Sequence, residues 1–179
     1  QMTREEMDEY SIESLRRANA AIDSGAFADE VVPVTFSTRK GEVTVEHDEQ
    51  PGKGRPDKIP QLRPAFAKDG TITAATSSSI SDGAAAVVLS RDSVAKANGQ
   101  QPVAKIVAMA AHAQEPAQFT VAPIGAIEKV LEKAGWSADE VELWEVNEAF
   151  ACVAMFAMRD IGIPHDRINI NGGGTALGH

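Results

Sequence analysis

The second half of the chain alternates between segments typical of β-strands and segments typical of helices, and this alternation constrains the fold more than any other feature. Short runs rich in Val and Ile precede amphipathic stretches that open near Pro or Asn and close at Gly. A strand–helix–strand order is typical of an α/β layer with parallel strands covered by helices. We predict strands at 103–111, 141–146 and 167–170 and helices at 123–134 and 147–161.

The first half of the chain is less regular. Residues 3–22 predict a helix, because Thr3 and Glu6 form a capping-box pattern and apolar residues recur at helical spacing until a Ser-Gly pair stops them. Short alternating or small apolar runs indicate strands elsewhere. A hairpin-like pair is expected at 31–37 and 42–46, and a buried strand at 84–89.

A proline-rich stretch, residues 51–64, contains four of the nine prolines and has no periodicity, which indicates a loop. Residues 53–68 carry five basic side chains and one acidic side chain, a net charge of +4 in a chain of net charge -9. A solvated loop explains such a cluster. It also suits an anionic ligand such as a nucleotide phosphate, with Lys53 and Arg55 as candidate contacts.

Composition narrows the classes of protein to which the chain can belong. The 26 acidic and 17 basic residues argue against nucleic acid as a partner, and no run of 18 apolar residues is present that would cross a membrane. With one cysteine, Cys152, and no leader-like segment, a reducing cytoplasmic location is expected. Both ends fall where domains do not normally stop, so we expect an internal piece of a longer protein.

Asn147-Glu148-Ala149-Phe150 lies between a predicted strand and a predicted helix, where open α/β sheets bind their ligands. Asn147 has two interpretations at this place. It is the N-cap of the following helix, which the pattern alone favours. Alternatively, its amide holds a catalytic water or a substrate oxygen, and Glu148 beside it contributes a hydrogen bond.

A glycine-rich segment, residues 169–179, follows the last predicted strand and ends at His179. Glycines permit positive φ angles and expose N–H groups that can hold a phosphate or an oxyanion. The segment matches neither the dinucleotide-binding pattern nor the Walker A pattern. His179 is the best placed of the four histidines for a general base or oxyanion donor, the alternative being an ordinary structural or surface histidine.

Two other features have an ordinary explanation beside a chemical one. Cys152 is a nucleophile candidate, but it lies within an amphipathic helix and is more typical of a buried small apolar residue. The serines at 77–79 belong to a small polar stretch that lets a ligand approach closely, or they are loop filler. The histidines show no metal-ligand spacing, so no metal is expected.

Five sequence motifs occur together in a fixed order and spacing. They are L-R-P-A-F at 62–66, T-I-T-A-A-T-S-S-S-I-S-D-G-A-A-A-V-V-L-S at 71–90, V-L-E-K-A-G-W at 130–136, N-E-A-F-A at 147–151 and N-I-N-G-G-G-T-A-L-G-H at 169–179. In this combination the chain resembles the thiolase family, that is, acetyl-CoA C-acetyltransferases and 3-ketoacyl-CoA thiolases. The resemblance covers nearly all of residues 3–179.

The resemblance implies an α/β thiolase fold, of which this chain is a part. That fold is a duplicated, five-layered α-β-α-β-α core with an inserted loop domain that covers coenzyme A. On this basis residues 1–70 are expected to belong to the loop domain, 71–100 to the end of the N-terminal half, and 101–179 to the start of the C-terminal half.

The resemblance also implies roles for individual residues. His179 helps to activate the nucleophile and, with a water held by Asn147, forms an oxyanion hole for the thioester oxygen. Coenzyme A and acyl-CoA are then substrates, no prosthetic group is expected, and a homodimer or homotetramer is implied. Residues implied to bind coenzyme A are Ser78 on the pantetheine, Phe66, Phe119, Phe150 and Ala149 along its tunnel, and Arg55 and Lys53 at the phosphates.

The resemblance has gaps at chemically decisive positions. The nucleophilic cysteine of the family lies upstream of this segment and its second cysteine lies downstream of His179, so Cys152 matches neither. Residues 74–79 and Phe119 differ from many members, which bears on acyl-chain preference. The main hypothesis is an acyltransferase that condenses acetyl-CoA or cleaves 3-ketoacyl-CoA by thiolysis. The alternative is a non-catalytic thiolase-like protein that binds acyl-CoA or lipid.

Overall fold

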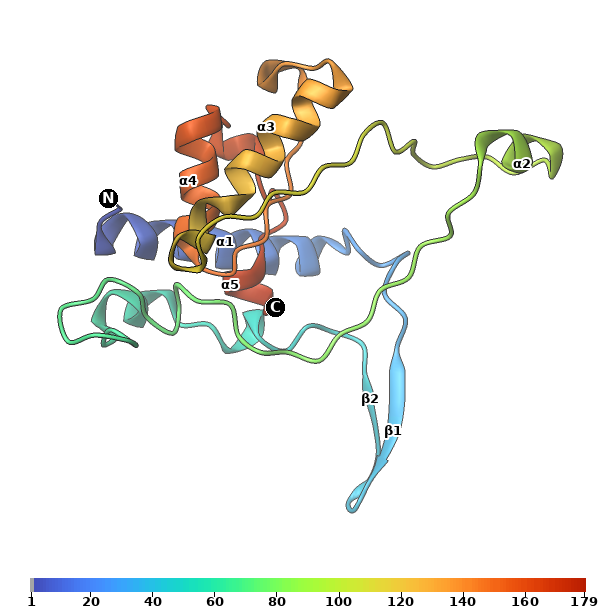
Figure 1. The fold of residues 1–179 in the computed structure, drawn as a ribbon. Helices are drawn as coiled ribbons and strands as arrows, with labels where there is room; N and C mark the ends of the chain where they lie inside the picture. The colour runs from blue at the N-terminus through green and yellow to red at the C-terminus, as the bar shows by residue number, and fades with distance from the viewer. Residues whose placement is uncertain (1) are drawn as a thin grey trace.

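The computed structural model describes residues 2–179 and shows a helical body from which a hairpin and a long extended excursion project (Figure 1). Its helices are α1 (Arg4–Ser24), α2 (Asp92–Ala97), α3 (Ala122–Ala134), α4 (Ala151–Ile161) and α5 (Gly174–Leu177), and its strands are β1 (Val34–Thr38) and β2 (Gly41–Val45). Short 3-10 helices lie at Pro51–Lys53, Pro56–Gln61, Pro116–Val121, Ala138–Glu140 and His165–Arg167. No helix among residues 2–179 is long and apolar enough to span a bilayer.

Helix α1 begins and ends where the sequence predicts. The Thr3 hydroxyl accepts a hydrogen bond from the backbone N–H of Glu6, and the Glu6 carboxylate accepts one from the N–H of Thr3. Both halves of the capping box are therefore present. Gly25 ends the helix with a φ of 69°, the left-handed conformation that favours glycine. Helix α3 likewise ends at Gly135, with a φ of 70°.

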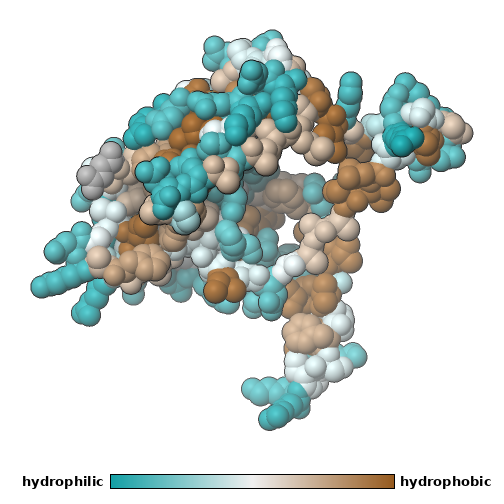
Figure 2. Space-filling model, viewed as in Figure 1, coloured by the Kyte–Doolittle hydropathy of each residue, from teal (hydrophilic) through white to brown (hydrophobic). Residues whose placement is uncertain are grey.

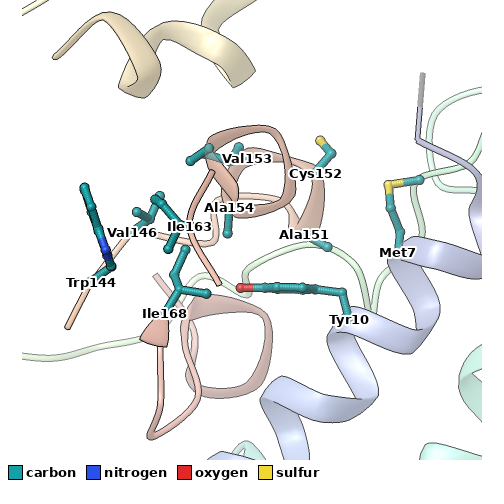
Figure 3. Close-up of a cluster of buried hydrophobic side chains, with 11 residues drawn as sticks. Met7, Tyr10, Trp144, Val146, Ala151, Cys152, Val153, Ala154, Ile163 and Ile168 are labelled. Atoms are coloured by element: carbon teal, nitrogen blue, oxygen red, sulfur yellow. The ribbon is translucent and has the colours of Figure 1, made fainter. Parts of the chain in front are cut away.

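Two clusters of buried side chains hold α1 in the body. The larger lies between α1, α4 and the segments around residues 144 and 168, and Figure 3 shows the Tyr10 side chain reaching from α1 toward Ile168. Burying each large apolar side chain contributes about 1.5–3 kcal/mol, so this cluster anchors the helix. The smaller cluster joins α1 to α5 and to the 3-10 helix Pro56–Gln61, through Leu15, Ala18, Ile59 and Ala176.

Strands β1 and β2 form the predicted hairpin. They pair antiparallel from Val34 opposite Val45 to Thr38 opposite Gly41. Gly41 has a φ of 118°, which the tight connection requires and which other residues rarely adopt. Both faces of the hairpin are exposed, and it points away from the helical body (Figure 1).

Four segments predicted as strands do not form strands. Segments 141–146 and 167–170 do run parallel, but they meet only at an isolated bridge between Trp144 and Ile168. Segments 84–89 and 103–111 follow the extended excursion, and the expected burial of 84–89 is wrong because Val88 is 96% exposed. A strand needs a neighbour to complete its backbone hydrogen bonds, and residues 2–179 place none beside these two segments. Figure 2 shows hydrophobic residues gathered along this excursion.

Helix α4 begins four residues later than predicted, and its N-cap is Phe150 instead of Asn147. The residues before it stay extended because they pair with the small polar stretch. The N–H of Ser78 donates to the carbonyl of Ala149 at 3.1 Å, and the N–H of Ala151 donates to the carbonyl of Thr76 at 2.9 Å. The interpretation of Asn147 as a helix cap is therefore wrong.

Candidate active site

Three segments that are distant in sequence meet where α4 begins. The polar stretch 76–79 runs beside residues 149–151, with an antiparallel bridge between Ser77 and Phe150. At its other end, the carbonyl of Ser79 accepts a hydrogen bond of 2.7 Å from the N–H of His179. The polar stretch thus lies between the N-E-A-F motif and the end of the glycine-rich segment.

Asn147 and Ser78 converge on Gly174. A Cβ atom at this glycine would lie 3.1 Å from Ser78 Oγ and 3.2 Å from Asn147 Oδ1, so the absence of a side chain lets both polar groups approach. Asn147 is exposed. Ser78 Oγ is buried and has no hydrogen-bond partner among residues 2–179. A buried hydroxyl without a partner is unfavourable by about 1–3 kcal/mol, which a hydrogen bond to a bound ligand would offset.

His179 is brought to this place by its neighbouring glycine. Gly178 has a φ of 103°, and a Cβ atom there would overlap the hydroxyl of Ser81. Only glycine tolerates both the backbone conformation and the close contact. His179 is exposed, and its backbone is held beside Ser79.

Of the three phenylalanines named from the sequence, Phe66 and Phe119 both contact Phe150. The ring centroids of Phe66 and Phe150 lie 6.1 Å apart with the rings edge to face, and those of Phe119 and Phe150 lie 5.9 Å apart. Phe66 is 75% exposed and Phe119 is 48% exposed. Exposed rings in contact present an apolar surface, which suits the apolar part of a ligand. Ala149, half-buried, adjoins this cluster.

The basic residues line a second part of the same region. A pocket of about 380 Å³ has among its lining residues the basic Lys53, Arg55 and Lys58 and the hydroxyl-bearing Ser77, Ser79 and Thr175. Lys53 lies 3.9 Å from the carboxylate of Glu49, an exposed pair that contributes little to stability. The structure therefore brings Lys53 and Arg55 beside the polar stretch.

Glu148 is the most extensively hydrogen-bonded side chain of the region and is completely buried. Its carboxylate accepts hydrogen bonds from the side chains of Tyr10, Ser14 and Asn169, and from both the hydroxyl and the N–H of Thr175. The sequence predicts a hydrogen bond from Glu148 but does not reveal these partners. The available signal was the pair Tyr10 and Ser14, polar residues one turn apart on the buried face of α1.

Tyr10 is strongly affected by this environment. Burial, reinforced by the charge of Glu148, raises the pKa of its phenol far above the ordinary value of 10.0. The ring of His165 stacks on Tyr10 with centroids 5.3 Å apart. Burial and the nearby guanidinium of Arg17 lower the pKa of His165. The His165 imidazole that stacks on Tyr10 therefore favours its neutral form.

Cys152 lies on α4 in the larger apolar cluster and is 7% exposed. Burial raises the pKa of its thiol, which disfavours the reactive thiolate. The interpretation of this residue as a buried small apolar side chain is confirmed. Among residues 2–179 no group of three or more His, Cys, Asp or Glu side chains is arranged to hold a metal ion.

Comparison with known proteins places these features in a family. The family described as "Thiolase, N-terminal domain" matches residues 1–93, and "Thiolase, C-terminal domain" matches residues 100–179. The chain belongs to the thiolase family. An acetyl-CoA acetyltransferase of Yarrowia lipolytica is 49% identical over 178 residues, which cover 99% of this chain and 45% of the relative.

Solved thiolase structures share the fold. The acetyl-CoA acetyltransferase of Bacillus anthracis superposes with a TM-score of 0.96 at 40% identity, over 99% of this chain and 45% of that one. A thiolase of Ascaris suum in complex with coenzyme A superposes with a TM-score of 0.91 at 41% identity, over 99% of this chain and 46% of that one. The predicted partial thiolase fold is confirmed.

The chain spans about half the length of the thiolases that it matches. Since the superposition on the Bacillus anthracis enzyme covers 99% of this chain, the extended segments 84–89 and 103–111 follow nearly the path that they have in a thiolase. Their strand-like sequences are therefore consistent with the fold, although no neighbouring strand lies within residues 2–179.

Proposed function

We propose that the protein carrying this sequence is an acyl-CoA acyltransferase of the thiolase type. It condenses two acetyl-CoA molecules or, in the reverse direction, cleaves a 3-ketoacyl-CoA by thiolysis. The observation that carries the proposal is the arrangement around Gly174. There an exposed amide of Asn147 converges with the buried hydroxyl of Ser78, which has no partner within residues 2–179. A cluster of exposed phenylalanine rings adjoins them through Phe150.

The binding residues divide by the chemistry of coenzyme A. In our proposal Phe66, Phe119 and Phe150, with Ala149, contact the apolar part of the pantetheine arm. Ser78 forms a hydrogen bond with one of its amide groups, which satisfies the buried hydroxyl. Lys53 and Arg55 lie at the pocket beside the polar stretch and attract the phosphates. The thiolase of Ascaris suum, solved with coenzyme A, supports this choice of ligand.

The chemistry assigned to Asn147 and His179 is oxyanion stabilisation. When a thioester carbonyl is attacked or forms an enolate, negative charge develops on its oxygen, and prearranged donors stabilise that charge. In this proposal Asn147 acts through a bound water and the His179 ring acts directly, while His179 also helps to activate the nucleophile. Cys152 is too buried for that nucleophile, so we assign the acyl-cysteine to a residue outside these 179 residues.

The domain assignment belongs to the same proposal. We assign residues 1–70 to the domain that covers coenzyme A, 71–100 to the end of the N-terminal half and 101–179 to the start of the C-terminal half. The charge distribution supports the first assignment, because the basic stretch at 53–68 lies in that part of the chain.

Assembly as a homodimer or homotetramer and a cytoplasmic location complete the proposal, with no prosthetic group. Membership of the thiolase family supports the assembly. The single cysteine, which forms no disulfide among residues 2–179, is consistent with a reducing compartment. Light scattering of the purified protein tests the assembly, and cell fractionation tests the location.

Thiolysis of acetoacetyl-CoA by the protein that carries this sequence tests the activity. We expect turnover in the wild type and a reduction by at least about a hundredfold in His179→Ala, since removal of one oxyanion donor has an effect of that size. His47→Ala is the matched control, because that side chain is 75% exposed on a distant segment. Wild-type rates in His179→Ala would contradict the assigned role. Binding of coenzyme A without turnover in the wild type would favour the non-catalytic alternative.

A further inference from the structure

Glu148 is a buried carboxylate surrounded by neutral donors. Its Oε1 accepts from the Tyr10 hydroxyl at 2.7 Å and from Asn169 Nδ2 at 2.8 Å. Its Oε2 accepts from the Ser14 hydroxyl at 2.8 Å and from the hydroxyl and N–H of Thr175 at 2.7 and 3.1 Å. Five donors on two oxygens saturate a carboxylate, which is an acceptor only.

The direction of these hydrogen bonds follows from the second contacts of the hydroxyls. The Ser14 hydroxyl accepts from the N–H of Gly173 at 3.0 Å, so its own proton is free to point at Glu148. The Tyr10 hydroxyl accepts from Asn169 Nδ2 at 3.3 Å, so its proton is directed in the same way. The donors therefore form a consistent set around Glu148.

The same carboxylate joins α1 to the glycine-rich segment. Tyr10 and Ser14 lie on α1, Asn169 lies at the start of the glycine-rich segment, and Thr175 lies within it. The space for the carboxylate depends on the glycine at 173, because a Cβ atom there would overlap the Glu148 carboxyl carbon. Glu148 therefore sets where the glycine-rich segment runs.

We propose that Glu148 is a positioning residue for the oxyanion site, acting through its covalent neighbour Asn147 and through the glycine-rich segment that ends at His179. The inference rests on the proposed function, since it concerns the residues assigned to the oxyanion site there. Because the Glu148 side chain is held by α1 and by Thr175, its backbone is fixed and the Asn147 amide is left facing Gly174 and Ser78.

Glu148→Gln tests the role of the carboxylate while keeping its volume. The glutamine amide places an NH2 group, which only donates, where a carboxylate oxygen accepted hydrogen bonds. The donors that faced this oxygen, such as Ser14 and Thr175 at Oε2, then have no acceptor. We expect kcat for thiolysis to fall about a hundredfold, because a small displacement of reacting groups has that effect, while KM changes by less than about twofold. Amide exchange of the 171–179 segment should become faster.

Two comparisons separate positioning from a general loss of structure. Glu145→Gln makes the same substitution three positions away at an exposed side chain, and we expect wild-type kcat. Thr175→Val removes one donor without changing shape and should lower kcat about tenfold, whereas Thr175→Ser restores the hydroxyl and should restore most of kcat. The threonine pair decides the question if Glu148→Gln does not fold.

The outcomes distinguish this inference from the proposed function. If the wild type shows no thiolysis, the proposed function fails, but amide exchange of residues 171–179 in Glu148→Gln still decides whether Glu148 holds the segment. A kcat within about twofold of wild type in a folded Glu148→Gln, or unchanged exchange in the segment, overturns the inference. Failure of Thr175→Ser to recover what Thr175→Val loses overturns it as well.

Discussion

The position of Asn147 is set by its neighbours on both sides in sequence. Glu148 turns into the interior, and Ala149 pairs with Ser78 through the backbone. These two constraints keep residue 147 out of the helix that follows, which is capped at Phe150. An asparagine at the end of an extended segment thus remains available to a ligand, although its sequence pattern is typical of a helix cap.

Asn147→Ala distinguishes a cap from an oxyanion residue. We expect kcat to fall by about 100- to 1,000-fold, the effect of removing one oxyanion donor. The free energy of unfolding should change by less than about 0.5 kcal/mol, whereas loss of a cap has an effect of about 1 kcal/mol. Thiolysis rates and denaturant unfolding of the same preparations measure both. A decrease of about 1 kcal/mol in the free energy of unfolding, with unchanged kcat, would support the cap interpretation.

The buried phenol of Tyr10 predicts a pH dependence of stability. Its pKa is raised in the folded protein, so between the unfolded value of 10.0 and the folded value only the unfolded chain loses this proton. Stability due to this group is therefore fully present below about pH 10 and falls above it, by about 1.4 kcal/mol per pH unit. Tyr10→Phe should remove that slope.

Tyrosinate absorbance checks this prediction directly, because Tyr10 is the single tyrosine of the sequence. The difference in absorbance between wild type and Tyr10→Phe isolates its titration even if other tyrosines are present in a longer chain. We expect little tyrosinate signal from the folded protein at pH 10. A midpoint near pH 10 under native conditions would show that the phenol is not protected.

At the scale of the elements, α1 and the glycine-rich segment form one unit. Gly172 has a φ of 80°, and a Cβ atom on it would lie 2.6 Å from the carbonyl oxygen of Ser14. Arg17 adds to the contact, since its guanidinium donates to the carbonyl of Ile168 at 2.7 Å. The close approach of helix and loop requires glycine at this position.

Gly172→Ala should therefore destabilise the protein by about 2–4 kcal/mol, because strain from the positive φ adds to overpacking against α1. Gly52→Ala is the matched control, since a Cβ atom there meets nothing within 4 Å and its φ is not in the left-handed region. Denaturant unfolding measures both variants. Equal stability of the two would refute the tight contact between the segment and α1.

Local signals account for the elements that the sequence predicts well. Helices α1 and α3 carry their own start or stop residues, such as Thr3, Gly25 and Gly135, so their bounds follow from nearby sequence. The short helix α2 was missed, because one Asp92–Lys96 pair on six residues is a weak pattern. Strand pairing at 84–89 depends on residues elsewhere, which periodicity does not reveal.

The candidate site divides in the same way. The resemblance to thiolases singles out Phe66, Phe119 and Phe150 as ligand-binding residues. In the structure their rings lie together. The partners of Glu148 on α1 escaped prediction because Tyr10 lies 138 residues away along the chain. A buried carboxylate is recognised from its donors, and donors that far away leave no local pattern.

At the scale of the whole molecule, the excursion that carries α2 exposes apolar side chains. Val88 is 96% exposed and Leu89 is 72% exposed. Unpaired extended segments with apolar side chains bind other apolar surfaces readily. Their exposure contrasts with the buried clusters around α1, which resemble the interior of an ordinary domain.

The 179-residue polypeptide should therefore bind a hydrophobic dye such as anilinonaphthalene sulfonate strongly. Replacing Val88 and Leu89 by Thr should reduce the fluorescence measurably, because both apolar side chains are exposed on this excursion. Val32→Thr, at an exposed position outside this excursion, should have less effect than the double replacement. Equal fluorescence of the wild type and both variants would show that the dye does not bind at Val88 and Leu89.

The contacts that join α1 to the glycine-rich segment also bear on synthesis in the cell. Ser14 and Gly173, which hydrogen-bond, are separated by 159 residues. A ribosome adding about 5–20 residues per second needs roughly 10–30 s to make the chain between them. Throughout that interval the part of α1 that carries Tyr10 and Ser14 lacks its partners from residues 144–175, so nascent-chain chaperones have a long opportunity to hold it before the site closes.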